Sequence, residues 1–192
     1  AIVGDEAGGS WIARQAIRVV YDACYRFGQQ TLLTEIVMKE LGVNDKYYLM
    51  EAISSNLTQR KVNLTTLTIA VFECANKKDK VALQILKSMA DNLARSAGGC
   101  VVNLNFPEEV EIVLAGSVWV KGSCPVLIEE FTKKIEQYTN KKCKIITLNV
   151  PPATGAIVWA LELATGKFPN YETRKLISGN VEKELGRIEH HE

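Results

Sequence analysis

Two short runs rich in β-branched residues, separated by an amphipathic stretch, limit the folds open to this chain more than any other feature. The runs cover residues 111–115 and 143–148, and both have the composition of strands. Between them, apolar residues recur at helical spacing over residues 126–138. A helix that joins two strands in this way acts as a crossover, which places the strands side by side and parallel. The sequence therefore predicts an α/β protein.

Helical periodicity dominates the rest of the chain, so the predicted fold is helix-rich. The expected helices cover residues 10–27, 31–41, 45–56, 67–75, 81–98, 155–164 and 172–185. Gly28, Gly42 and Gly166 follow three of these segments and are expected to end them, with Gly28 as the first residue beyond its helix. The charged run 77–79 is expected to be a solvated turn between two helices.

Composition and charge exclude several classes of protein. The chain has 192 residues, of which 47% are hydrophobic and 23% are charged, and its net charge is +1. This charge offers no electrostatic basis for binding nucleic acid or an anionic membrane. No apolar run approaches the ~18 residues of a membrane span. The five cysteines are widely spaced and form no C-x-x-C pair, which favours reduced thiols in a cytoplasmic protein over disulfides or a zinc site.

The start of the chain carries the clearest candidate for a binding site. Asp5 and Glu6 precede a Gly/Ser run, after which a helical pattern begins. Glycines allow the backbone to present N–H groups at a helix start, and the carboxylates can accept hydrogen bonds from a polyhydroxyl ligand. The plain alternative is a helix cap in which the acidic residues complement the helix dipole. Because an apolar triplet leads straight into this motif, we also expect the chain to be a fragment that lacks an N-terminal portion.

The same segment resembles a motif of a known family. Residues 4–14 read GDEAGGSWIAR and resemble the G-D-E-G-S-x-x-W-I-G-R motif of the BadF/BadG/BcrA/BcrD ATPase family, in the branch of the N-acetylglucosamine kinases. The spacing fits without a gap, although Ala7 and Ala13 replace glycines and the Gly/Ser order is shuffled. The resemblance implies that the motif lines a sugar pocket and that Asp5 and Glu6 contact the sugar.

A second motif follows the first predicted strand. From the residues alone, Gly116 and Ser117 form either a ligand-binding turn at the carboxyl end of a strand or an ordinary turn. Residues 112–119 (IVLAGSVW) resemble the adenosine motif of the actin-like sugar kinases and heat-shock ATPases, which implies that Gly116 and Ser117 cover the adenosine of ATP. Residues 152–156 (PATGA) resemble the family's P-x-x-G-A, whose small residues are expected to let a helix pack closely on the sheet.

The resemblance covers residues 4–166 and implies a fold. The implied fold is an incomplete actin-like (ribonuclease H-like) C-terminal lobe, with residues 1–166 forming the lobe and residues 167–192 a C-terminal helix and tail of the same domain. The chain contains no Asp-Gly-Gly-Gly-Thr and no Gly-Thr-Gly-Ser phosphate loop. We therefore expect the chain to be inactive by itself and to depend on a missing N-terminal lobe of the same protein.

The implied activity is the ATP- and Mg²⁺-dependent phosphorylation of N-acetylglucosamine or a related amino sugar. No residue of this chain is expected to be catalytic, and a homodimer is left open. Two alternatives remain. The ATPase activators of 2-hydroxyacyl-CoA dehydratases and benzoyl-CoA reductases share the fold, but they hold an iron–sulfur cluster with cysteines, and no cysteine here sits in a convincing ligand pair. A sugar-sensing module without catalysis would keep only the acidic motif.

Overall fold

The computed structural model describes residues 6–59 and 61–189. The chain divides into two compact units, one made of Ala1–Ile112 and Lys121–Ile145 and the other of Val113–Val120 and Ile146–Glu192. The family resemblance implied a different division, into a lobe of residues 1–166 and a C-terminal helix and tail of residues 167–192. That division stays a prediction.

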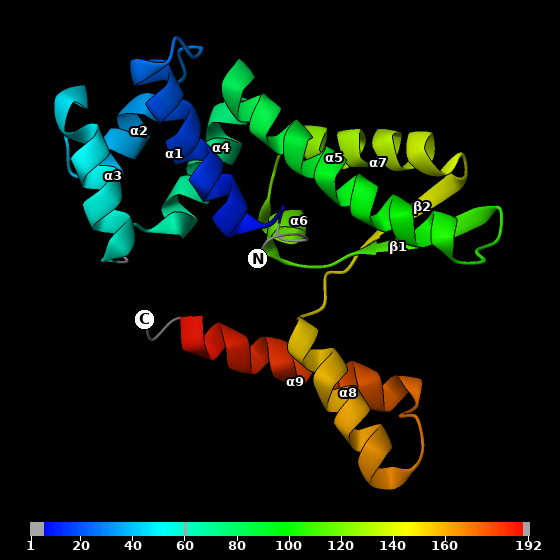
Figure 1. The fold of residues 1–192 in the computed structure, drawn as a ribbon. Coiled ribbons are helices and arrows are strands. Elements are labelled where there is room, and N and C mark those ends of the chain that lie inside the picture. The colour runs from blue at the N-terminus through cyan, green and yellow to red at the C-terminus, as the bar shows by residue number, and fades with distance from the viewer. Residues whose placement is uncertain (1–5, 60, 190–192) are drawn as a thin grey trace. The chain divides into compact units, whose positions relative to one another are not determined.

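The first unit is mainly helical (Figure 1). Its helices are α1 (Gly9–Tyr25), α2 (Leu33–Glu40), α3 (Leu49–Thr58), α4 (Leu64–Asn76), α5 (Lys80–Asn103) and α7 (Pro125–Thr139), with a short 3-10 turn (Lys46–Tyr48) before α3. Helix α7 packs along α5, and α1 packs against α4. The fully buried side chains include those of Ile12, Val20, Leu67, Leu86, Met89, Leu127, Phe131 and Ile135. The core therefore lies between the helices of this unit, because each turns one apolar stripe toward the others.

Strands β1 (Glu109–Leu114) and β2 (Lys142–Thr147) form a two-stranded parallel sheet, and α7 lies between them in the chain. The helix-rich α/β fold predicted from the sequence is confirmed. Val110 and Cys143 are the buried side chains near the start of the two strands. On the exposed side, Lys144 Nζ lies 2.7 Å from Glu111 Oε1 and links the strands. The crossover explains the parallel arrangement, since two strands joined by a helix run in the same direction.

The second unit contains α8 (Pro152–Thr165) and α9 (Tyr171–Glu189), which pack against each other, and most of the five-residue helix α6 (Ser117–Lys121). Gly166 ends α8 with a left-handed backbone (φ 68°), as predicted, and Gly42 has a φ of 70° just beyond α2. Among the helices of the described ranges, none has both the length and the apolar character that crossing a membrane requires.

The end of α1 differs from the expectation. The residue with a positive φ is Phe27 (58°), one position before Gly28, so Gly28 is not the first residue beyond the helix cap. The Gly28 amide donates to Asp22 O (2.9 Å), and a Cβ on Gly28 would lie 2.7 Å from the Asp22 carbonyl carbon. Glycine is needed here because the chain passes close to the helix backbone.

The end of α5 also differs from the expectation. The helix runs to Asn103 and passes through Gly98, where the sequence predicted its end. Gly98 is buried, and a Cβ placed on it would lie 3.3 Å from Tyr138 Cβ of α7. The glycine therefore allows two helices to approach each other and does not stop the first one.

The turn between α4 and α5 is only partly solvated, in contrast to the prediction from its charged residues. Lys77 and Lys78 are exposed, but Asp79 is partly buried. Its carboxylate accepts hydrogen bonds from Ala82 N (2.9 Å), Leu32 N (2.8 Å) and Thr31 Oγ1 (3.0 Å). Asp79 thus caps α5 and fixes the segment that leads into α2.

Candidate functional site

The acidic motif lies directly before α1. Asp5 is outside the described residues, whereas Glu6 is exposed. Helix α1 begins after Gly8, whose φ of 91° is a conformation that favours glycine, and no side chain of the described residues caps this end. The first turn of α1 holds no acidic residue. Glu6 therefore forms no side-chain cap on α1, and the contact of the acidic pair with a sugar stays a prediction.

Two neighbouring helices hold the backbone of this motif. Asn92 Nδ2 of α5 donates to Glu6 O (2.9 Å), and Thr68 Oγ1 of α4 donates to Gly9 O (2.8 Å). A surface hollow of about 190 Å³ opens at the same place, lined by Glu6, Ala7, Asn92, Leu93 and Ser96. The sequence carried no signal for Thr68 or Asn92, because both lie far along the chain from the motif and only packing brings them to it.

The second motif lies in the second unit. Strand β1 ends at Leu114, Gly116 takes a φ of 116°, and Ser117 is the first residue of α6. The Gly116 carbonyl accepts hydrogen bonds from the amides of Trp119 (3.1 Å) and Val120 (3.2 Å). Gly116 and Ser117 are both exposed, and a Cβ on Gly116 would meet no atom within 4 Å. The space over this backbone is open, and the contact of these two residues with adenosine stays a prediction.

The P-x-x-G-A segment begins α8. Gly155 is exposed, and a Cβ placed on it would meet no atom within 4 Å. The expectation that small residues here let the helix pack on the sheet stays a prediction. Thr154 is the buried residue of this segment, and its Oγ1 has no hydrogen-bond partner among the described residues.

The five cysteines are free thiols. Cys74, Cys124 and Cys143 are buried, and burial raises the pKa of the Cys74 and Cys143 thiols above its usual value. The described ranges contain no group of three or more His, Cys, Asp or Glu side chains that could hold a metal ion. We therefore assign no Mg²⁺ ligand to this chain.

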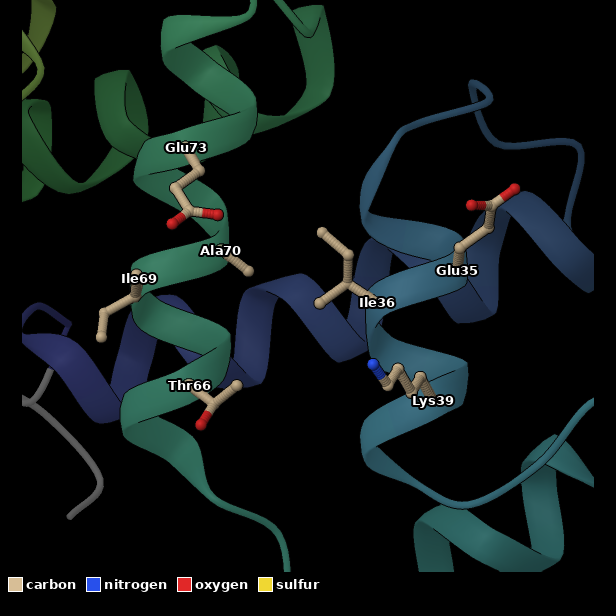
Figure 2. A pocket seen from close by; sticks show the side chains of 7 residues that line it. All are labelled: Glu35, Ile36, Lys39, Thr66, Ile69, Ala70 and Glu73. Atoms are coloured by element: carbon tan, nitrogen blue, oxygen red, sulfur yellow. The ribbon is translucent and has the colours of Figure 1, made fainter.

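A further hollow of about 430 Å³ lies between α2 and α4 (Figure 2). Ile36 and Lys39 project from α2 toward α4, and Glu73 lies near the far end of α4. The complete lining consists of Glu35, Ile36, Lys39, Thr66, Ile69, Ala70 and Glu73. Neither sequence motif contributes a residue to this hollow, so we assign no function to it.

The comparison with known families decides the identity. The model of the BadF/BadG/BcrA/BcrD ATPase family matches residues 1–160, which include both motifs. The chain belongs to this family. The match confirms the resemblance of the opening motif and places the chain among the ATP-using proteins that the family name describes.

Two curated relatives are kinases by name. The chain is 28% identical over 160 residues to the N-acetylmuramic acid/N-acetylglucosamine kinase of Clostridium acetobutylicum, covering 83% of this chain and 51% of that protein. It is 26% identical over 164 residues to the N-acetyl-D-glucosamine kinase of Dictyostelium discoideum, covering 83% of this chain and 50% of that protein. The chain thus spans about half the length of the curated relatives that it matches.

Proposed function

We propose that the protein carrying this chain is an ATP-dependent kinase that phosphorylates N-acetylglucosamine or a related amino sugar. In this proposal the chain forms the C-terminal actin-like (ribonuclease H-like) lobe. The two relatives named as kinases support the reaction class. The observation that carries the sugar assignment is the exposure and the backbone contact of Glu6. Glu6 is exposed beside a small surface hollow, its carbonyl accepts a hydrogen bond from Asn92 of α5, and its side chain does not cap α1.

Each motif has a distinct task in this proposal. Asp5 and Glu6 accept hydrogen bonds from sugar hydroxyls, which orients the sugar and distinguishes it from less hydroxylated molecules. Gly116 and Ser117 cover the adenosine of ATP. Phosphoryl transfer depends mainly on such positioning and on neutralising charge, which Mg²⁺ supplies when it is bound with ATP. No residue of this chain is proposed as the base that accepts the proton of the attacking hydroxyl.

The proposal is tested by removing each carboxylate in the full-length protein. We expect Asp5→Ala and Glu6→Ala each to lower kcat/KM for the sugar by about tenfold to a hundredfold, because a charge-assisted hydrogen bond contributes about 1.5–3 kcal/mol. The KM for ATP should stay near its wild-type value. N-acetylglucosamine, N-acetylmuramic acid, glucosamine and glucose, assayed by coupled ADP release, would identify the preferred substrate.

Glu51→Ala is the matched control, since it removes an exposed carboxylate from α3 in the same unit. A loss of sugar kinetics in the control as large as in the two motif variants would mean that general charge explains the result. Normal sugar kinetics in both motif variants would remove the acidic pair from the site. Sugar binding without any turnover would instead favour a sensor, and absorbance near ~400 nm would favour the iron–sulfur activator.

A further inference from the structure

We propose that Thr68 and Asn92 are positioning residues for the sugar-binding motif, because the helix pair α4–α5 holds the backbone of Glu6 and Gly9 through them. The inference rests on the proposed function and adds two residues to it. Neither residue belongs to a sequence motif, and each acts through the backbone of the motif and not through contact with the reacting atoms.

The two contacts lie at the two ends of the segment that links Glu6 to α1. Asn92 Nδ2 donates to Glu6 O at 2.9 Å, and Thr68 Oγ1 donates to Gly9 O at 2.8 Å. Glu6 and Ala7 belong to neither a helix nor a strand. Gly8 follows with a φ of 91° and has no side chain that could pack. The path of this segment is therefore set by bonds from outside it.

The residues that provide these bonds are themselves held firmly. Thr68 Oγ1 also lies 2.8 Å from Leu64 O of its own helix, so its single proton is shared between this carbonyl and that of Gly9. Its chain neighbour Leu67 is fully buried, and Asn92 lies on α5 between the buried Ala90 and Ala94. Helices α4 and α5 pack against each other and against α1. The motif thereby takes its position from the buried core of the first unit.

This arrangement matters for the reaction because phosphoryl transfer is sensitive to position. A displacement of about 1 Å can cost about a hundredfold in rate when it misplaces a group that orients the substrate. Asn92 also lines the hollow beside Glu6, together with Ala7, Leu93 and Ser96. Loss of an anchor should leave the helices folded, because neither bond belongs to the core, but the backbone of Glu6 and Gly9 would no longer be held in one place.

Isosteric variants of Thr68 give the sharpest test. Thr68→Val removes the hydroxyl and keeps the shape and the β-branch, whereas Thr68→Ser keeps the hydroxyl. In the full-length protein we expect Thr68→Val to lower kcat/KM for N-acetylglucosamine by about threefold to tenfold, as the loss of one hydrogen bond predicts. Thr68→Ser should restore most of the activity, and the KM for ATP should be unchanged in both.

Asn92→Ala gives an independent measurement, with Asn103→Ala as its matched control. Asn103 lies on the same helix, and its side chain donates to Gly99 O of that helix (2.7 Å). We expect Asn92→Ala to raise the KM for the sugar by about threefold to tenfold and to speed hydrogen exchange at the amides of residues 7–11. Asn103→Ala should change neither quantity.

The outcomes separate the inference from the function on which it rests. If the wild-type protein neither binds nor phosphorylates an amino sugar, the proposed function is wrong and the role in sugar binding fails with it. If the wild type acts on the sugar while Thr68→Val and Asn92→Ala keep normal sugar kinetics, the positioning role alone is overturned. A lower thermal midpoint with unchanged sugar kinetics would likewise assign both residues to stability only.

Discussion

Four glycines in this chain occupy three different physical environments. Gly116 adopts a φ of 116°, which an L side chain rarely accepts, although the space around it is open. Gly28 and Gly98 sit where another part of the chain comes close. Gly155 has neither constraint, because it lies within α8 with no atom near its would-be Cβ. The sequence alone does not show which glycine has a positive φ, which one lies close to another segment, and which one has neither constraint.

This difference gives a prediction of opposite sign for two glycines. Gly116→Ala should lower the free energy of unfolding by about 1–3 kcal/mol, because it forces a side chain onto a strained backbone. Gly155→Ala should raise it by about 0.5–1 kcal/mol, because alanine favours a helix interior more than glycine does. Urea denaturation of the two variants beside the wild type measures both changes.

The same Gly116 variant tests the proposed adenosine contact. In the full-length protein, the added Cβ would occupy the open space over the backbone, so affinity for a non-hydrolysable ATP analogue should fall while sugar binding is unchanged. Calorimetry on the folded variant measures both affinities. An unchanged affinity for the nucleotide would exclude Gly116 from the site.

At the scale of elements, the short connection between α4 and α5 also contacts the segment before α2. Asp79 accepts hydrogen bonds from the N-terminal turn of α5 and from residues 31 and 32 before α2. Burial raises the pKa of this carboxyl, but the hydrogen bonds from Ala82, Leu32 and Thr31 outweigh it, and the net pKa lies below the ordinary value. The charged form is thus the one that the fold prefers.

A lowered pKa in the folded state gives stability that is present at neutral pH and lost in acid. We expect the contribution of Asp79 to the free energy of unfolding to be complete above about pH 4, the value for an unfolded aspartate, and to decline as the pH falls through the lower folded value. Asp79→Asn should therefore be less stable than the wild type at pH 7, and the difference should narrow as the pH falls below the folded pKa of Asp79.

Urea denaturation across this pH range measures the effect, and Glu51→Gln serves as a control at an exposed carboxyl of α3. Asp79→Ala removes the cap altogether and should cost about 0.5–2 kcal/mol at pH 7. A difference between the wild type and Asp79→Asn that is constant with pH would contradict the lowered pKa.

At the scale of the whole molecule, the chain holds two motifs in two units. Glu6 lies in the first unit, whereas Gly116 and Ser117 lie in the second. The curated relatives are about twice as long as the matched region. Neither the Asp-Gly-Gly-Gly-Thr nor the Gly-Thr-Gly-Ser phosphate-loop motif occurs in the 192 residues of this chain.

The prediction at this scale is that the 192-residue chain has no kinase activity by itself. A coupled ADP-release assay with N-acetylglucosamine and Mg-ATP should remain at background. Rates of about 1–100 per second, which are ordinary for kinases, would show that the chain carries its own phosphate-binding and catalytic groups. The full-length protein, assayed beside it, is the positive control.

The sequence by itself determined the class of the fold and the family. The spacing of apolar residues predicted α1, α7, α8 and both strands to within a few residues, because helical and strand periodicities are local properties. The opening motif indicated a family that the match over residues 1–160 confirms. Local pattern was sufficient here because these features depend on residues close together in the chain.

Only the tertiary structure decided which residues act on one another over long separations. The bonds from Thr68 and Asn92 to the motif span 59 and 86 residues, and no periodicity predicts such pairs. Gly98 of α5 lies where Tyr138 of α7 comes close, and the role of Asp79 depends on where α2 begins. Such contacts could not be predicted from the sequence, because a side chain meets a distant backbone group only after the helices that carry them have packed together.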